Sequence, residues 1–278
     1  MFQDISIDYN IEYDSKAIKS EDIVLAYSDG KMLYALDDEN NLCLPKYSCA
    51  ENKAGKDDVL FLFSLNNKRF FLWNIYQKLE CNGFKYDNIN LLKGVNSDSC
   101  LYAAVTGYHY YSFHKENKFC GKCGEKLRHV PEKRCMICDN CKNEIFPKIS
   151  PAVIVGVIDE ETDSILMTRY AQGDYKKLAL VAGFAEMGES GEQAAVREVM
   201  EETGLSICDL KYFSSQPWGF AQNILIGYFA KTKGSRKIIM DESELSEAVW
   251  VKRQDVSAQP DSISLTGEML WAFKNSKV

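Results

Sequence analysis

The chain of 278 residues has the length of two domains and a small insert, and its 46% hydrophobic and 26% charged residues exclude wholesale disorder. Its 33 basic and 40 acidic residues give a net charge of −7, which excludes a uniformly basic nucleic-acid coat, so that an anionic substrate needs metal ions or a local basic patch. No apolar run reaches the roughly 18–20 residues of a membrane span, and residues 1–4 lack the pattern of a signal peptide. These features predict a cytoplasmic protein.

The first part of the chain is expected to be an N-terminal domain of mostly β character, residues 1–114. Apolar runs at 23–27 and 32–36 flank an Asp-Gly dipeptide, which is typical of a β-hairpin. A second pair of runs, 59–65 and 69–75, is joined by a short segment with two asparagines. The region holds no cluster of catalytic residue types, and its role stays open.

The last part of the chain mixes strands and helices, which favours an α/β or α+β sandwich. Apolar runs at 152–158 and 165–169 predict two strands. A glycine-rich loop, a helix and further strands follow, and a last helix is expected at about 266–274.

The ten cysteines fall into two classes. Five are scattered and are expected to be small buried residues or surface thiols, because a disulfide framework is not expected in a cytosolic chain. These are Cys43, Cys49, Cys81, Cys100 and Cys208. The other five lie close together between residues 120 and 141, which favours metal binding.

The clustered cysteines form two C-x-x-C units, Cys120 with Cys123 and Cys138 with Cys141. Two such turns can direct four thiolates at one Zn²⁺ in a closed tetrahedral site, which leaves no coordination position for chemistry and is therefore structural. Cys135 is also three residues from Cys138, so the second pair could shift. The 138/141 pair is preferred because Asp-Asn makes a better turn than Met-Ile.

The stretch around these cysteines is mildly basic on an acidic protein. Residues 115–148 carry nine basic and five acidic side chains. With four thiolates and one zinc ion the balance is about +2. A solvated face is the favoured interpretation, and a contact for phosphates or RNA is the alternative.

The most informative segment is 183–205, with six glutamates and one arginine. Ser190 followed by Gln193 predicts a capping box, and Gly204 predicts the helix stop, so that a helix of about thirteen residues lies between them. Such a concentration of like charge on one helix requires a compensating partner.

Three glutamates of this helix, Glu198, Glu201 and Glu202, are spaced to share one face. Arg197 alone cannot pair with all of these acids. Hard divalent cations with oxygen ligands can, and a bound Mg²⁺ or Mn²⁺ could bridge phosphates and activate water. A solvated acidic helix is the alternative.

The segment resembles the Nudix box, G-x₅-E-x₇-R-E-U-x-E-E-x-G-U with U apolar. The match covers every defined position: Gly183, Glu189, Arg197, Glu198, Val199, Glu201, Glu202, Gly204 and Leu205. The resemblance implies a Nudix α/β/α sandwich within an α+β chain, and a hydrolase that splits a nucleoside diphosphate linked to another moiety with Mg²⁺ or Mn²⁺.

The resemblance also implies roles for single residues. Glu198 and Glu202 are expected to be metal ligands, and Glu201 a ligand or a base acting through water. The backbone carbonyl of Ala182 and the side chain of Glu244 are expected to bind metal as well. Arg197 and Glu189 are expected to form a structural ion pair, and which glutamate is the general base stays open.

A second stretch, Ser-Gln-Pro-Trp-Gly-Phe-Ala-Gln-Asn at 215–223, resembles the S-Q-P-W-P-F-P-x-S signature of the NADH pyrophosphatase branch. Its aromatic rings can stack on a base or nicotinamide, and its amides can bond to ring edges; two core aromatics in a strand are the alternative. Three positions depart from this signature, and two of them have lost a proline; the departures loosen the loop. The implied substrate contacts are Gln216, Pro217, Trp218, Gly219, Phe220, Ala221, Gln222 and Asn223, with Phe146 and Ser264.

A four-cysteine zinc ribbon just before a Nudix domain is the architecture of the same branch. The implied domains are residues 1–114, a zinc ribbon at 115–146 and a Nudix domain at 147–278. The implied reaction is hydrolysis of NAD(H) to NMN(H) and AMP by a homodimer, with removal of NAD caps from RNA as an extension. The alternatives are a Nudix pyrophosphatase for ADP-ribose or dinucleoside polyphosphates, and a catalytically dead zinc-ribbon adaptor that binds RNA.

Overall fold

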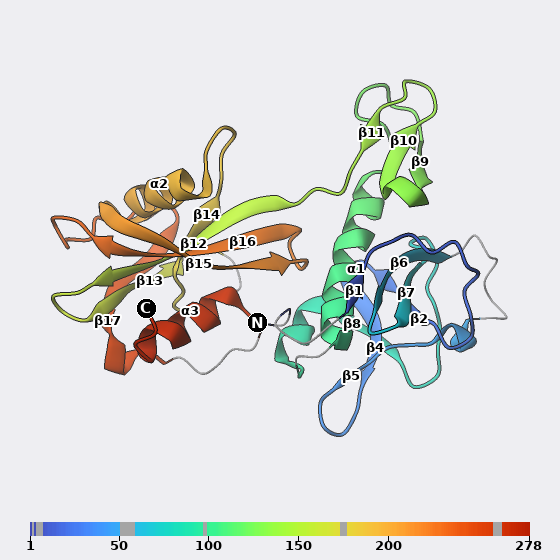
Figure 1. Cartoon of the computed structure of the whole chain (residues 1–278), viewed down its shortest axis with the longest axis horizontal. Helices are drawn as coiled ribbons and strands as arrows, with labels where there is room; N and C mark the ends of the chain where they lie inside the picture. The colour runs from blue at the N-terminus through green and yellow to red at the C-terminus, as the bar shows by residue number, and fades with distance from the viewer. Residues whose placement is uncertain (2, 4–7, 51–58, 97–98, 173–176, 258–262) are drawn as a thin grey trace. The chain divides into compact units, whose positions relative to one another are not determined.

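The computed structural model describes residues 1, 3, 8–50, 59–96, 99–172, 177–257 and 263–278. The chain divides into two compact units (Figure 1). The C-terminal unit comprises Met1, Ile149–Trp218 and Asn223–Val278, and the N-terminal unit comprises Phe2–Lys148 and Gly219–Gln222. Among the described residues, no helix is both long and apolar enough to cross a membrane.

The N-terminal unit contains two four-stranded sheets, ordered β1-β6-β7-β2 and β3-β4-β5 with β8 beside β4. Both predicted hairpins are present, and the two central residues of each have the positive φ of a tight hairpin turn. In the first turn φ is 48° at Asp29 and 76° at Gly30. In the second turn φ is 48° at Asn66 and 63° at Asn67. The strands are β1 (Tyr9–Asn10), β2 (Ile23–Leu25), β3 (Tyr27–Ser28), β4 (Lys31–Leu36), β5 (Leu42–Cys43), β6 (Val59–Leu65), β7 (Lys68–Trp73) and β8 (Lys85–Asn88), with the 3₁₀ helices η1 (Tyr47–Cys49) and η3 (Ile89–Gly94).

A long helix, α1 (Ser99–Glu116), was not predicted from the sequence. Its buried residues include consecutive runs, 101–105 and 111–114, so the apolar pattern is not confined to one face. The Tyr27 hydroxyl donates to the Ala104 carbonyl at 2.7 Å and fastens α1 to the strands of its own unit. The helix is therefore a core element of the N-terminal unit.

One pair of the scattered cysteines corrects the sequence analysis. Cys49 and Cys81, expected to be free, form a disulfide with their Cα atoms 5.5 Å apart. They lie 32 residues apart, and only the tertiary fold brings them together. Cys43, Cys100 and Cys208 lie outside this disulfide and are half-buried, between the buried and the surface positions that were expected.

The clustered cysteines lie in and beside a small three-stranded sheet of the N-terminal unit, ordered β11-β10-β9. Its elements are β9 (Leu127–Val130), η4 (Pro131–Lys133), β10 (Cys135–Cys138) and β11 (Glu144–Ile145). Buried Phe113, Leu127 and Met136 pack with two of the cysteines and form its core.

The C-terminal unit is a six-stranded mixed sheet between helices (Figure 1). The strands run in the order β15-β16-β12-β13-β17, β12 and β16 are parallel, and β14 also pairs with β12. The elements are β12 (Ser150–Asp159), β13 (Ser164–Tyr170), β14 (Val181–Phe184), α2 (Gly191–Thr203), β15 (Ile207–Trp218), β16 (Asn223–Thr232), β17 (Leu245–Lys252), η5 (Arg253–Asp255) and α3 (Leu265–Lys274).

Alternate residues of β12 point to opposite faces of this sheet and enter different cores. Val153 and Val155 pack with Val199 of α2, whereas Ile154 packs with Phe273 of α3. The sheet therefore carries one helix on each face, which confirms the expected α+β sandwich.

Candidate functional site

The structure contains a closed group of four thiols, the cysteine cluster, formed by Cys120, Cys123, Cys138 and Cys141. Their sulfurs all lie within 4.8 Å of one another, and three of the pairs are 3.4–3.6 Å apart. A tetrahedral zinc ion with bonds of about 2.3 Å fits such a group. Cys135 lies outside it, buried in β10, where burial raises the pKa of its thiol.

The backbone around the cysteine cluster favours a thiolate at Cys120. The backbone N–H of Lys122 donates to the Cys120 sulfur at 3.4 Å, and backbone donors of this kind lower the pKa of Cys120 to about 6. A thiolate is the form that binds a metal ion. The four residues therefore fit a structural zinc ion.

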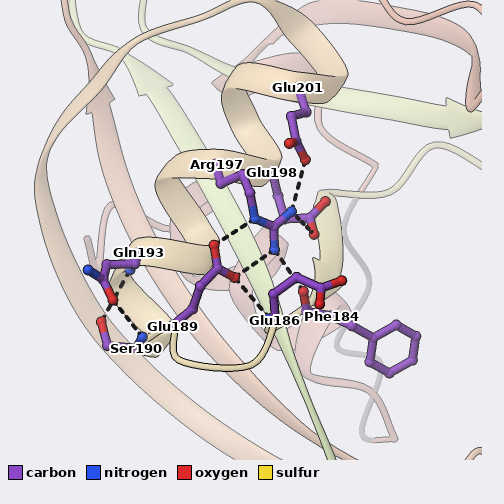
Figure 2. Close-up of polar contacts among 8 residues, drawn as sticks. All are labelled: Phe184, Glu186, Glu189, Ser190, Gln193, Arg197, Glu198 and Glu201. Atoms are coloured by element: carbon purple, nitrogen blue, oxygen red, sulfur yellow. Dashed lines mark hydrogen bonds and ion pairs between the residues drawn. The ribbon is translucent and has the colours of Figure 1, made fainter.

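Helix α2 carries the predicted glutamates and has the predicted ends. The Ser190 hydroxyl accepts from the Gln193 backbone N–H at 3.3 Å, and the Gln193 side chain accepts from the Ser190 N–H at 2.8 Å (Figure 2). Gly204 closes the helix with a φ of 67°. This confirms the capping box, the stop and the length of thirteen residues.

Arg197 is the centre of a network that joins α2 to the loop before it (Figure 2). Its guanidinium donates to both carboxylate oxygens of Glu189 at 2.7 and 2.8 Å and to the Phe184 carbonyl at 2.9 Å. The same group donates to Glu198 at 2.8 Å and to Glu201 at 2.9 Å. The predicted Arg197–Glu189 ion pair is present, and these donors lower the pKa of Glu189 to about 2.

Glu202 lacks such a partner. Its side chain is almost fully buried, and its Oε2 has no hydrogen-bond partner. Burial, with the charges of Glu198, Glu244 and Asp241, raises the pKa of Glu202 to about 8. Burial also raises the pKa of Glu198, whose carboxylate fills the space that a side chain at residue 183 would need. The absence of a side chain at Gly183 therefore leaves room for the carboxylate of Glu198, a predicted metal ligand.

An orphaned, buried carboxylate oxygen among like charges is the environment that a divalent cation relieves. Glu198, Glu202 and Glu244 interact electrostatically, so the segment before β17 faces α2. The Ala182 carbonyl, on β14, accepts a hydrogen bond from the Tyr170 hydroxyl at 3.1 Å. We call Glu198, Glu201, Glu202, Glu244 and the Ala182 carbonyl the glutamate site, and its oxygen donors fit a hard divalent cation.

Tyr170 was missed by the sequence analysis. It lies at the end of β13, and the three carboxylates Glu202, Glu198 and Glu244 act on its hydroxyl. In the sequence it is an aromatic residue at the end of a strand, with no motif around it. Only the three-dimensional structure places it beside the Ala182 carbonyl.

The predicted substrate stretch is divided between the two units. In the C-terminal unit, Pro217 is exposed, whereas Trp218 and Asn223 are half-buried at the facing ends of β15 and β16. Gly219–Gln222 form the turn between these strands and are assigned to the N-terminal unit. Residues 215–223 are therefore shared between the two units, and their contact with a substrate stays a prediction.

Two of the predicted substrate contacts have internal partners. Gln216 is fully buried, its amide donates to the Ile263 carbonyl at 2.6 Å, and it accepts from the Leu265 N–H at 2.7 Å. This burial argues against a contact between its side chain and a substrate. Ser264 caps α3 by accepting from the Gly267 N–H at 3.1 Å. Phe146, in contrast, is 56% exposed and open to a ligand.

Comparisons with known proteins agree with this geometry. Residues 148–269 match the NUDIX domain, and residues 115–146 match the NADH pyrophosphatase zinc ribbon domain. Curated relatives from Salmonella typhi and Salmonella heidelberg, both described as the NAD-capped RNA hydrolase NudC, are 34% identical over 177 residues, which is 63% of this chain and 68% of theirs. A crystal structure of a NUDIX hydrolase from Nitrosomonas europaea is 22% identical and has a TM-score of 0.45, over 58% of this chain and 92% of that one.

The two domain matches fall on the two sites that the residues define, the cysteine cluster in the ribbon and the glutamate site on α2. The chain therefore belongs to the Nudix hydrolase family, in the branch that carries the NADH pyrophosphatase zinc ribbon.

Proposed function

We propose that this chain hydrolyses the pyrophosphate of NAD(H) to NMN(H) and AMP, and removes the same cap from RNA whose 5′ end carries NAD. The relatives described as NAD-capped RNA hydrolases and the pairing of this ribbon with a Nudix domain support the choice of substrate. The observation that carries the chemistry is the buried Oε2 of Glu202, which has no hydrogen-bond partner and lies among other carboxylates.

Glu198, Glu202, Glu244 and the Ala182 carbonyl would hold Mg²⁺ or Mn²⁺. The bound cation would neutralise charge on the pyrophosphate and lower the pKa of water. Arg197 holds Glu198 and Glu201 in place through charge-assisted hydrogen bonds. In the reaction the oxygen of water bonds to one phosphorus, the bridging P–O bond breaks, and the displaced phosphate leaves on the second nucleotide.

The aromatic residues of the branch signature supply the proposed contacts with the nucleotide. Trp218 would stack on one of its rings, and Phe220 and the exposed Phe146 stay predicted substrate contacts. The proposed domains are residues 1–114, 115–146 and 147–278. The proposed assembly is a homodimer. Sedimentation of the purified chain tests this assembly.

The test is product chromatography after incubation of the zinc-loaded protein with Mn²⁺ and NADH, ADP-ribose or diadenosine tetraphosphate in parallel. We expect NMNH and AMP in equal amounts from NADH, at a higher kcat/KM than for the other two substrates. RNA carrying a 5′ NAD should yield RNA with a 5′ monophosphate. Faster cleavage of ADP-ribose would overturn the choice of substrate, and no hydrolysis of any nucleotide would favour the adaptor.

A further inference from the structure

The Tyr170 hydroxyl is directed at the backbone atom that the glutamate site offers to a metal ion. It donates to the Ala182 carbonyl at 3.1 Å. A carbonyl oxygen has two lone pairs, so one can accept this hydrogen bond while the other binds a cation.

A β-bulge fixes the position of this tyrosine. The pairing of β13 with β17 shifts register between Arg169 and Tyr170, so that Arg169 pairs with Glu247 and Tyr170 with Leu245. The extra residue, Ser246, donates its hydroxyl to the carbonyls of Arg169 and Tyr170, both at 3.2 Å. Bulges next to active sites commonly redirect a side chain in this way.

The same bulge also positions a carboxylate of the glutamate site. The N–H of Ala171 donates to the Glu244 carbonyl at 2.8 Å, directly beside the Tyr170–Leu245 pair. The chain between α2 and β17 is tied to the helix as well, because the Asp241 N–H donates to the Glu202 carbonyl at 3.0 Å. Tyr170, the last residue of β13, and Glu244, the residue just before β17, are therefore held beside each other in one fixed register.

We propose that Tyr170 is a positioning residue for the catalytic cation: its hydroxyl orients the Ala182 carbonyl, and the bulge at Ser246 holds Tyr170 and Glu244 in a fixed register beside it. The proposal rests on the proposed function, since it assigns a part of the same metal site. Groups that hydrogen-bond a metal ligand typically change metal affinity or activity by about 10–100-fold when removed.

The test compares Tyr170→Phe with wild type, and with Tyr212→Phe as a matched control at an exposed position of β15. Mn²⁺ binding is measured without substrate, by electron paramagnetic resonance of the free ion, on zinc-loaded protein. We expect the Kd for Mn²⁺ to rise about 10–100-fold in Tyr170→Phe and to stay unchanged in Tyr212→Phe. The Mn²⁺ concentration for half-maximal NADH hydrolysis should shift by the same factor, while kcat at saturating Mn²⁺ largely recovers.

The outcomes separate the two proposals. An unchanged Kd for Mn²⁺ in Tyr170→Phe, with wild-type hydrolysis of NADH intact, overturns the role of Tyr170 alone. A wild type that binds Mn²⁺ but hydrolyses no nucleotide overturns the proposed function and leaves the Mn²⁺ titration as the test of Tyr170. If Tyr170→Phe does not fold, Ser246→Ala replaces it, with a smaller shift of the Mn²⁺ affinity expected in the same direction and an unchanged affinity counting against the proposal.

Discussion

The cysteine cluster and the glutamate site differ in how their ligand atoms are held before any metal binds. Within the described part of the chain, the cysteine cluster is the one group of three or more His, Cys, Asp or Glu side chains whose ligand atoms all lie within 4.8 Å of one another. In the glutamate site, Glu198 and Glu201 accept hydrogen bonds from Arg197, whereas Oε2 of the buried Glu202 has no hydrogen-bond partner.

This difference fits two kinds of ion. Four gathered sulfurs make a closed site that holds zinc permanently and adds to folding free energy. Carboxylates that Arg197 already binds can release and take up a hard cation together with a phosphate substrate. The comparison predicts that loss of the first ion affects the fold, whereas loss of the second affects the reaction.

The largest effect is expected from removing a zinc ligand. Structural zinc contributes about 10–16 kcal/mol in zinc-finger peptides, so Cys141→Ser should lose the bound zinc and the folded ribbon. Zinc per chain is measured by atomic emission, and ribbon order by amide hydrogen exchange. The matched control is Cys135→Ala, which should keep one zinc ion. Zinc loss in the control, with zinc retained in Cys141→Ser, would show that the second pair is 135/138.

A smaller effect, confined to the reaction, is expected from Glu198→Gln. Its carboxylate is a proposed metal ligand, so kcat for NADH should fall about 10²- to 10⁴-fold while zinc content and melting temperature stay near those of wild type. Glu192→Gln, at an exposed position of the same helix, is the control and should keep its activity. Full activity in Glu198→Gln would remove it from the catalytic assignment.

The sequence alone predicted the parts of both sites that depend on short spacings. Two C-x-x-C units, the Ser190–Gln193 capping box and the stop at Gly204 each need only a few neighbouring residues, and the structure contains all of them. The two hairpin turns of the N-terminal unit belong to the same class. Local backbone chemistry fixes such features before tertiary packing acts.

The sequence did not predict features that packing alone creates. Helix α1 is apolar on several sides and gives no clear period, and the Cys49–Cys81 bond joins residues with no spacing signal. Gln216 looked like a substrate contact because of its motif, yet the fold uses its amide to bond the segment before α3. Tyr170 reaches the glutamate site only through a register shift between two strands.

The smallest effect concerns the ion pair that holds the loop to α2. Arg197 lowers the pKa of Glu189 from its ordinary 4.5 to about 2, so the stabilisation is complete above pH 4.5 and is lost as the pH falls toward 2. Glu189→Gln should lower the melting temperature by about 2–4 °C at pH 7, and the difference from wild type should shrink between pH 4.5 and pH 3. Calorimetry across this range, with the exposed Glu186→Gln as control, measures it. A difference that stayed constant with pH would mean that the loop is held by packing and backbone hydrogen bonds, and that Arg197 serves chiefly to orient Glu198 and Glu201.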